Sequence, residues 1–587
     1  MPKANPVEIK KRYARLKGIK QNWESDWQSI AEYVLPRKGV INISRSRGQE
    51  QTERLFDSTA VHSLELLASS MHGSLTSSAY KWFSLKVREE YLNENFQIRT
   101  WLEECSKRMY LAFRQSNFNQ EIHEAYLDVV AFGTASIMVE ERPGEFPFNG
   151  LLFRSIPLNE YVIEENAQGK VDTLFREFKI SVRACEQMFG VQSFTDSLRK
   201  KLEENQDEHI TVLHAVFERA PDEVDEKSLP WASIYILAEE DHLLRESGYH
   251  EFCYAVPRWS KTSGEIYGRS PSHTGLPDIK TLNKCTELQL KALAKTIDPP
   301  VLVQDDGVLG NIRLVPSGIT VVRDASAITP FRIEPRWDIS TLKTNELREN
   351  VRRIYYADQL QMPQGPQMTA TEVNVRYELM QRLLGPTLGR LESELLNPLI
   401  ERTFQLMMRA GQFSPPPMEL VEFATQQGGS IDIEYEGPLA KSQRQVEVMA
   451  FQRTLEMAMP LSQIDQSILD NLNLDAAVRH IALVSGVPAN LLRAEEEIAQ
   501  MREQRAQAAQ AQAEQQQMLD ESTAMKNMAG PMRVLDESDI GKALTGMGEP
   551  GGEELPPELA EELGPAMDTE LPPEMEEELV AMGEEEE

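Results

Sequence analysis

The segment Pro277–Pro300, PDIKTLNKCTELQLKALAKTIDPP, is the most informative part of the sequence because its residues separate onto two faces when they are wound into a helix. At about 100° per residue, one sector is apolar and holds Ile279, Leu282, Leu290, Leu293 and Ile297. A second sector, about 60° wide, has Glu287 at its side and holds Lys280, Lys284, Lys291 and Lys295. The pattern predicts a helix from about Pro277 to Ile297 that packs through its apolar face.

The lysine sector admits two interpretations. At about 1.5 Å per residue it is roughly 22 Å long, which matches about six or seven base pairs, so it is long enough to run alongside duplex DNA. The simpler alternative is an ordinary solvated face, because lysine is common at exposed helical positions. The basic loop Arg37–Arg47 has no acid and admits the same choice, between a phosphate-contacting arm and a surface loop, of which the surface loop is simpler.

The residues after this helix suggest a hairpin-like stalk with a cap. A β-rich insert is expected over about Pro300–Pro335 and a return helix over about Ser340–Leu360. An irregular loop should follow, because two prolines and a glycine disfavour regular structure over Met362, Pro363, Gln364, Gly365, Pro366 and Gln367. Thr369 and Glu372 then form a capping box for a long leucine-rich helix that Gly385-Pro386 and Pro398 should kink or break.

The rest of the chain changes texture several times. Helical patterns cover residues 7–76, with an interruption at Pro36, and residues 95–130. Residues 135–259 contain short β-like runs separated by turns, which favours a mixed antiparallel domain. A short β-like piece at 431–435 precedes helices over 442–484 and 491–518, and the composition beyond Gly530 predicts disorder.

The composition describes a large, acidic chain. Its 587 residues suggest about four structural units, and 41% hydrophobic residues suffice for their cores. Against 93 Asp and Glu there are 61 Lys and Arg, and half of the net charge of −32 falls in residues 543–587, which carry sixteen acids and neither Lys nor Arg. This balance argues against a basic nucleic-acid coat or a polybasic membrane binder.

Searches of the sequence for chemistry find little. Four cysteines lie far apart with no Cys-x-x-Cys pair, which predicts reduced thiols and no zinc site. The sequence has no P-loop, nucleophile elbow, His-Glu-x-x-His or EF-hand pattern. It has no window apolar enough for a signal peptide or a membrane span. We therefore expect no catalytic residue, cofactor, metal or membrane contact.

Several short pieces, in this order along the chain, resemble the head-to-tail connector, or portal, family of short-tailed double-stranded DNA bacteriophages. Each piece alone is weak, and a structural role such as a turn before a helix explains any one of them. Their order and spacing across about residues 10–490 carry the resemblance. The pieces include LFDSTA at 55–60, LASSMHGSLT at 67–76, PRW at 257–259, YGRSP at 267–271 and MTATEV at 368–373.

The resemblance implies a ring of about twelve identical subunits at one capsid vertex, closed by head-to-tail contacts, through which DNA is packaged and ejected. It implies no enzyme activity. The implied partners are further copies of the chain, non-specific double-stranded DNA, the packaging terminase, capsid and scaffolding proteins and tail adaptor proteins. The implied location is the capsid–tail vertex of the virion, with the host cytoplasm during assembly.

The resemblance also divides the chain into regions. The wing would occupy residues 1–271, the first stem helix 272–298, the clip 299–338, the second stem helix 339–360 and the tunnel loop 361–368. A kinked helix and wing return at 369–438, crown helices at 439–490, a helical barrel-like extension at 491–529 and an acidic disordered tail at 530–587 would follow. In this scheme the four lysines face the DNA channel, and the loop at 362–367 narrows it.

Two other classes of function remain open. An internal virion or scaffolding protein without a DNA channel would explain the acidity, the Ala/Gln-rich helix and the lack of an active site. Such a protein would not require a stalk made of a helix, a β module and a second helix. A nuclease or hydrolase that uses carboxylates would require metal-dependent turnover.

Overall fold

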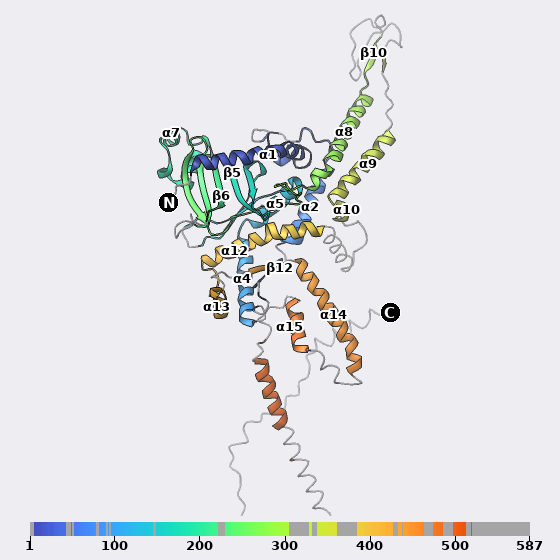
Figure 1. Cartoon of the computed structure of the whole chain (residues 1–587). Helices are drawn as coiled ribbons and strands as arrows, with labels where there is room; N and C mark the ends of the chain where they lie inside the picture. Colours follow the sequence, from blue (N-terminus) through green and yellow to red (C-terminus); the bar gives the residue numbers. More distant parts are fainter. Residues whose placement is uncertain are drawn as a thin grey trace, which may run out of the picture. The chain divides into compact units, whose positions relative to one another are not determined.

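The computed structural model describes residues 5–42, 48–49, 52–77, 81–87, 89, 92, 95–144, 148–220, 229–303, 328–330, 337–360, 384–426, 433–436, 438–462, 473–484, 493, 497–511 and 518. The chain divides into two units, residues 1–494 and 495–587. Helices dominate the described part of the first unit, together with four antiparallel sheets, which confirms the expected helix-dominated α+β class (Figure 1). In the second unit, residues 497–511 are helical. No described helix is long and apolar enough to cross a bilayer.

The amino-terminal helices build the largest hydrophobic core. They are α1 (Pro6–Val34), α2 (Thr59–Leu75), α4 (Phe96–Gln115) and α5 (Phe118–Phe132). Pro36 begins a short 3₁₀ turn just after α1, as the sequence predicted. Trp27 of α1 is fully buried, and its indole N–H donates to the carbonyl of Phe132 at the end of α5 (3.2 Å), which ties the first helix to the last.

The β-rich region contains a five-stranded antiparallel meander with strands in chain order. Its strands are β4 (Tyr161–Glu165), β5 (Val171–Ser181), β6 (His209–Glu218), β7 (Trp231–Leu237) and β8 (His242–Tyr249), and the short helices α6 (Val182–Phe189) and α7 (Asp196–Glu204) lie between β5 and β6 in the chain. This confirms the predicted antiparallel domain. Strands β4 and β8 have weak apolar patterns, because Glu164 and Glu165 end β4 and Arg245 and Glu246 lie within β8.

Helix α1 packs on this sheet through both apolar and charged contacts. Tyr13 belongs to a buried cluster with Phe175 of β5. Arg12 pairs with Glu164 (2.7 Å), Lys17 pairs with Glu177 (2.7 Å), and Lys10 pairs with Asp241 (2.6 Å). The basic amino-terminal residues therefore serve an internal docking role.

Three smaller sheets join distant parts of the chain. In a three-stranded sheet, β2 (Ile137–Glu141) lies between β3 (Leu151–Ser155) and β9 (Tyr254–Ala255). Strand β1 (Ser84–Val87) pairs with β12 (Ile433–Glu436), the β-like piece expected near residue 433, and so returns the chain to its amino-terminal half. Strand β10 (Val301–Val303) pairs with β11 (Ile328–Pro330).

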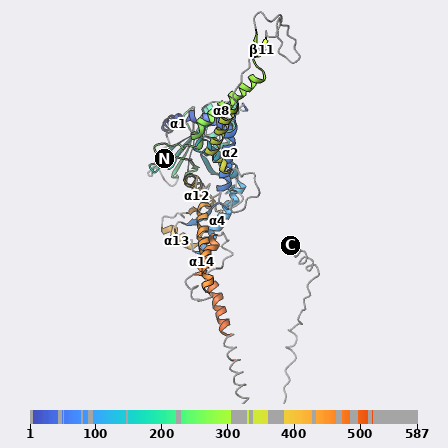
Figure 2. The same cartoon turned by 90° about the vertical axis from the view of Figure 1, so that its right-hand side faces the viewer.

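A stalk formed by α8 (Pro271–Ile297), β10, β11 and α9 (Trp337–Ile354) leaves the core, with the strands at its end (Figures 1 and 2). Two expectations were wrong in detail. Helix α8 begins at Pro271, before the predicted Pro277, which lies inside the helix. The return helix is not continuous: it ends at Ile354, and the short α10 (Ala357–Leu360) follows a break at Tyr356, whose φ is 56°.

The long leucine-rich helix is described from residue 384. Residues 384–391 are helical, Glu392–Leu396 form a π-turn, and α12 (Asn397–Arg409) continues the helix. Because Pro398 has no N–H for the carbonyl of Glu394, the irregularity predicted at Pro398 takes the form of this π-turn. Three further helices follow: α13 (Met418–Gln426), α14 (Pro438–Ser462) and α15 (Leu474–Val484).

Gly133 and Gly268 allow the end of α5 to lie close to the loop between β9 and α8. Gly133 ends α5 with φ of 82°, and a β-carbon there would collide with the backbone carbonyl of Gly268. We expect Gly133→Ala to lower the free energy of unfolding by at least about 2 kcal/mol, because it adds left-handed strain to a backbone clash. Urea unfolding followed by circular dichroism measures the change.

The same substitution at Gly18 is the matched control. Gly18 lies in the middle of α1, and a β-carbon there meets nothing within 4 Å. Gly18→Ala should stabilise the protein by about 1 kcal/mol, because alanine favours a helix interior. Equal effects of the two variants would contradict the assigned role of Gly133.

Candidate functional site

The candidate site is the stalk, because it carries the lysine sector. Its two helices touch closely near their base, where a β-carbon on Gly275 would lie 3.3 Å from the side chain of Ile354. Further out, Nε2 of Gln289 donates to Oγ1 of Thr344 (2.8 Å) across the pair. Ile279 is buried between these points, so the inner half of the apolar sector packs as expected.

The YGRSP piece starts α8 and attaches it to α5. Ser270 is the N-cap, and its hydroxyl donates to the carbonyl of Ala131 (2.7 Å). Its backbone N–H donates to Nδ1 of His273 (3.1 Å), and burial together with the nearby Arg269 lowers the pKa of His273 to about 4, so the ring stays neutral near pH 7. Tyr267 is buried in the core. The piece has a structural role.

A second piece, LFDSTA, holds both stalk helices at once. Oδ1 of Asn283 on α8 accepts the backbone N–H groups of Phe56 (2.7 Å) and Asp57 (3.1 Å), and its Nδ2 donates to the carbonyl of Arg54 (2.6 Å). Arg348 on α9 pairs with the buried carboxylate of Asp57 (2.9 Å). Residues 54–57, Asn283 and Arg348 form what we call the stalk anchor.

The electrostatics of the stalk anchor follow from these contacts. Burial raises the pKa of Asp57, but hydrogen bonds from Thr59 and the charge and hydrogen bonds of Arg348 outweigh it, so the net shift is downward. The carboxylate is therefore ionised throughout the neutral range. The anchor joins two segments that the sequence analysis had quoted separately, which only the folded chain reveals.

The four predicted lysines, here called the lysine face, lie on α8 about half a turn away from the residues that meet α9. Glu287 accepts from Lys284 (2.9 Å) and from Lys291 (2.5 Å), and these two bonds hold the pKa of Glu287 below its usual value. The Lys280 ammonium lies 5.9 Å from the centre of the Tyr33 ring. Lys295 is exposed, and among the described residues it has no ion pair.

The outer half of the apolar sector does not pack within the chain, contrary to the expectation that the whole sector would be covered. Leu290 is 50% exposed, Leu293 45% and Ile297 76%. We call these three residues the outer apolar face. Their exposure leaves an uncovered hydrophobic surface on the stalk. On the neighbouring helix Leu342 is 72% exposed, but at about 100° per residue it lies on the side of α9 opposite to Thr344, which contacts α8.

Other expected regions differ in how far the structure describes them. The loop from Met362 to Gln367, residues 304–327 of the β-rich insert and the tail beyond Gly530 lie outside the described residues. Of the basic loop, Arg37 pairs with Glu124 (2.9 Å) and Lys38 with the buried Asp128 (2.7 Å). These two cations therefore have internal partners.

Among the described residues no group of three metal-ligating side chains comes together. Burial raises the pKa of the Cys105 thiol to about 12 and that of Cys185 to about 11, which makes both thiols unreactive near neutral pH.

The sequence analysis missed Arg258, a buried charge that binds Glu165 and Glu394. The only signal for it in the sequence was its place in the PRW piece.

The stalk anchor makes a pH-dependent prediction. Because the folded-state pKa of Asp57 is lowered, its contribution to stability is present above the unfolded pKa of about 3.9 and is lost as the pH falls through the folded pKa. Asp57→Asn should cost about 1–2 kcal/mol at pH 7, and its deficit relative to the unchanged protein should shrink below about pH 4. Thermal melting at pH 7 and pH 3 measures both effects, with Glu346→Gln on an exposed α9 pair as the control. A deficit independent of pH would contradict the ion pair.

Known proteins resemble this chain over most of its length. The model of a family described as "Bacteriophage head to tail connecting protein" matches residues 7–492. The chain is 31% identical over 553 residues to a "Probable portal protein" of Bordetella phage BPP-1, across 91% of this chain and 98% of that protein. It is 27% identical over 526 residues to a "Portal protein" of Salmonella phage epsilon15, across 87% of this chain and 93% of that one. These matches confirm the resemblance, and the chain belongs to the family of bacteriophage head to tail connecting proteins.

Proposed function

We propose that copies of this chain form a ring at one capsid vertex and that the ring is the conduit for DNA packaging and ejection and the platform for the motor and the tail. The observation that carries the proposal is the stalk: two antiparallel helices with an uncovered apolar face and a separate lysine face. Membership of the head to tail connecting family supports the same conclusion. The conduit is a structural role without catalysis.

The outer apolar face supports self-association. Leu290, Leu293 and Ile297 leave apolar surface in water, which costs about 25 cal/mol for each Å² that another surface could cover. A head-to-tail contact between identical copies covers this face on every subunit and closes into a ring when the rotation per subunit divides a full turn. A ring of about twelve copies then leaves an axial hole.

The lysine face suits a channel through which DNA slides. Each lysine that neutralises a phosphate strengthens binding and increases its dependence on salt, so many such contacts would hold the DNA in place. Here Glu287 sits between Lys284 and Lys291 and offsets part of their charge. We propose that Lys280, Lys284, Lys291 and Lys295 approach the channel and that the loop 362–367 narrows it.

The regional assignment is part of the same proposal. Helices α8 and α9 correspond to the stem, the strands at the stalk end to the clip, and the amino-terminal core with its sheets to the wing. Helices α14 and α15 correspond to the crown, and residues 491–529 to a barrel-like extension. The proposed partners are the packaging terminase, capsid and scaffolding proteins, tail adaptors and double-stranded DNA. The proposed location is the capsid–tail vertex, reached from the host cytoplasm.

An internal virion or scaffolding protein is the alternative function, and imaging distinguishes the two. Electron microscopy of the purified full chain should show rings with a central hole. Elongated or polydisperse particles would favour the alternative. Metal-dependent hydrolysis by the purified protein would instead favour the nuclease class.

Ring assembly should depend on the outer apolar face. The double variant Leu290→Glu, Leu293→Glu places two carboxylates where a neighbouring copy would pack, so it should convert rings into monomers in light scattering. Val191→Glu, at a similarly exposed apolar position in the 3₁₀ turn Val191–Ser193, should leave the rings intact. Intact rings in the double variant would contradict this use of the stalk.

The lysine face should control the salt dependence of DNA binding. Replacing all four lysines by glutamine removes at most four phosphate contacts, so the slope of log K against log salt for duplex binding should fall by up to about 3.6. The control is a quadruple glutamine variant of exposed lysines outside the stalk, at Lys107, Lys170, Lys179 and Lys200. An unchanged slope in the stalk variant, with rings still formed, would overturn the assignment of the lysine face.

A further inference from the structure

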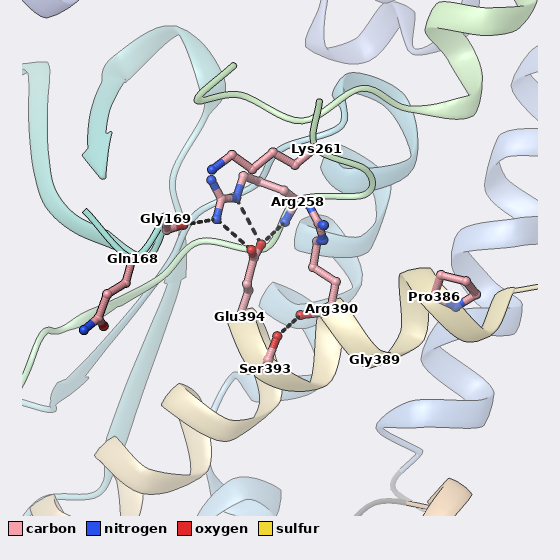
Figure 3. A pocket seen from close by; sticks show the side chains of 9 residues that line it. All are labelled: Gln168, Gly169, Arg258, Lys261, Pro386, Gly389, Arg390, Ser393 and Glu394. Carbon is pink, nitrogen blue, oxygen red and sulfur yellow. Dashed lines mark hydrogen bonds and ion pairs between the residues drawn. The ribbon is translucent and has the colours of Figure 1, made fainter. Parts of the chain in front are cut away.

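A polar cavity of about 440 Å³ lies away from the lysine face, where three segments of the chain meet (Figure 3). The turn between β4 and β5 supplies Gln168, and the loop before α8 supplies Arg258 and Lys261. The helix leading into the π-turn supplies Arg390, and the π-turn itself supplies Glu394. Residues from distant parts of the sequence therefore line one cavity, and Figure 3 shows the side chains of Arg258, Lys261, Arg390 and Glu394 close together, with the Gln168 side chain directed away from them.

Arg258 is the fixed framework of this cavity. Its Nε donates to Glu394 (3.1 Å), its Nη1 to Glu165 (2.8 Å) and to the carbonyl of Ile266 (3.2 Å), and its Nη2 to Glu394 (2.7 Å) and the carbonyl of Gly169 (2.9 Å). A guanidinium has five N–H donors, so all of them are used. Arg258 holds the walls in place and has no donor left for a ligand.

The two carboxylates that Arg258 binds, Glu394 in the cavity wall and Glu165 behind it, are also occupied. Both oxygens of Glu394 accept from Arg258, whose backbone N–H adds a further bond (2.9 Å). Both oxygens of Glu165 accept from Lys261 (2.8 and 2.6 Å), and one also accepts from Arg258. Neither acid is therefore an evident partner for Arg390.

The donors that remain belong to two other groups. Nη1 of Arg390 is buried and has no hydrogen-bond partner. Lys261 uses its ammonium on Glu165 alone, which leaves one of its three donors. Three cations face two carboxylates, so the site carries a surplus positive charge together with donors that lack acceptors.

We propose that this cavity binds a phosphate-class oxyanion, held by Arg390 and Lys261. A buried guanidinium N–H without an acceptor is costly, and a charged oxygen removes that cost while balancing the surplus charge. The cavity has the volume of a small-molecule site and therefore has room for a phosphate group. The group is either free phosphate or a phosphodiester of DNA. The proposal does not depend on ring formation.

Gly389 provides a way to close the cavity without touching its charges. It lines the cavity within a helical stretch, and a β-carbon there meets nothing within 4 Å. Leucine at this position occupies open space and favours the helix, so Gly389→Leu should fold and fill the cavity. Arg390→Gln removes the charge and leaves the cavity open. The two variants act by different means on the same site.

The test titrates the full chain with sodium phosphate at constant ionic strength, against sodium chloride, by isothermal calorimetry. We expect saturable phosphate binding that weakens at least about tenfold in Arg390→Gln and in Gly389→Leu. Arg199→Gln, in an exposed pair with Asp196, should bind phosphate as the unchanged protein does. Absence of saturable binding in the unchanged protein, or variants that both bind phosphate as tightly as the unchanged protein, would overturn the site.

A second arm identifies the source of the phosphate. If the ligand is a phosphodiester, Arg390→Gln should also weaken binding of a short duplex about tenfold, and free phosphate should compete with that duplex. If the ligand is free phosphate, duplex binding should be the same in Arg390→Gln and the unchanged protein while phosphate binding is lost. If Arg390→Gln binds both phosphate and the duplex as tightly as the unchanged protein does, the proposal is contradicted.

Discussion

The hydrogen bonds of Asn283 and the ion pair of Arg348 to residues 54–57 are the contacts on which the stalk depends. The outer half of α8 gains little burial against α9, so packing along the stalk cannot by itself fix its direction. The buried residues at the base, such as Ile279 and Leu347, and the directional polar contacts of the stalk anchor fix it together. The core therefore fixes the position of the base of the stalk.

A DNA conduit needs two surfaces with opposite requirements. Contacts between subunits should be apolar and persistent, whereas contacts with moving DNA should be polar and weak. Helix α8 carries one surface of each kind: Leu290, Leu293 and Ile297 lie toward α9, and the lysine face lies on the other side of the helix. Glu287 pairs with Lys284 and Lys291 and offsets part of their charge, which under the proposed function weakens their contact with DNA.

Arg258 shows how a buried charge organises the junction between the sheet and the long helix. It binds Glu165 at the end of β4 and Glu394 in the π-turn, and it is 2% exposed. A buried ion pair is a weak source of net stability, but loss of one partner leaves an unpaired charge and is strongly unfavourable. Its main effect is therefore to specify one arrangement of these elements, with the π-turn that Pro398 favours held beside the sheet.

The local elements follow from residue order alone: the period of α8, the end of α1 before Pro36, the β-like runs of residues 135–259 and the two faces of the stalk helix. These depend on residue spacing and on backbone chemistry, which are local. The pairing of Asp57 with Arg348, the binding of Glu165 and Glu394 by Arg258, and the exposure of Leu290 beside the burial of Ile279 arise when the chain folds. The sequence gives no separation in space for residues far apart along the chain, and burial is set by which surfaces the fold brings together.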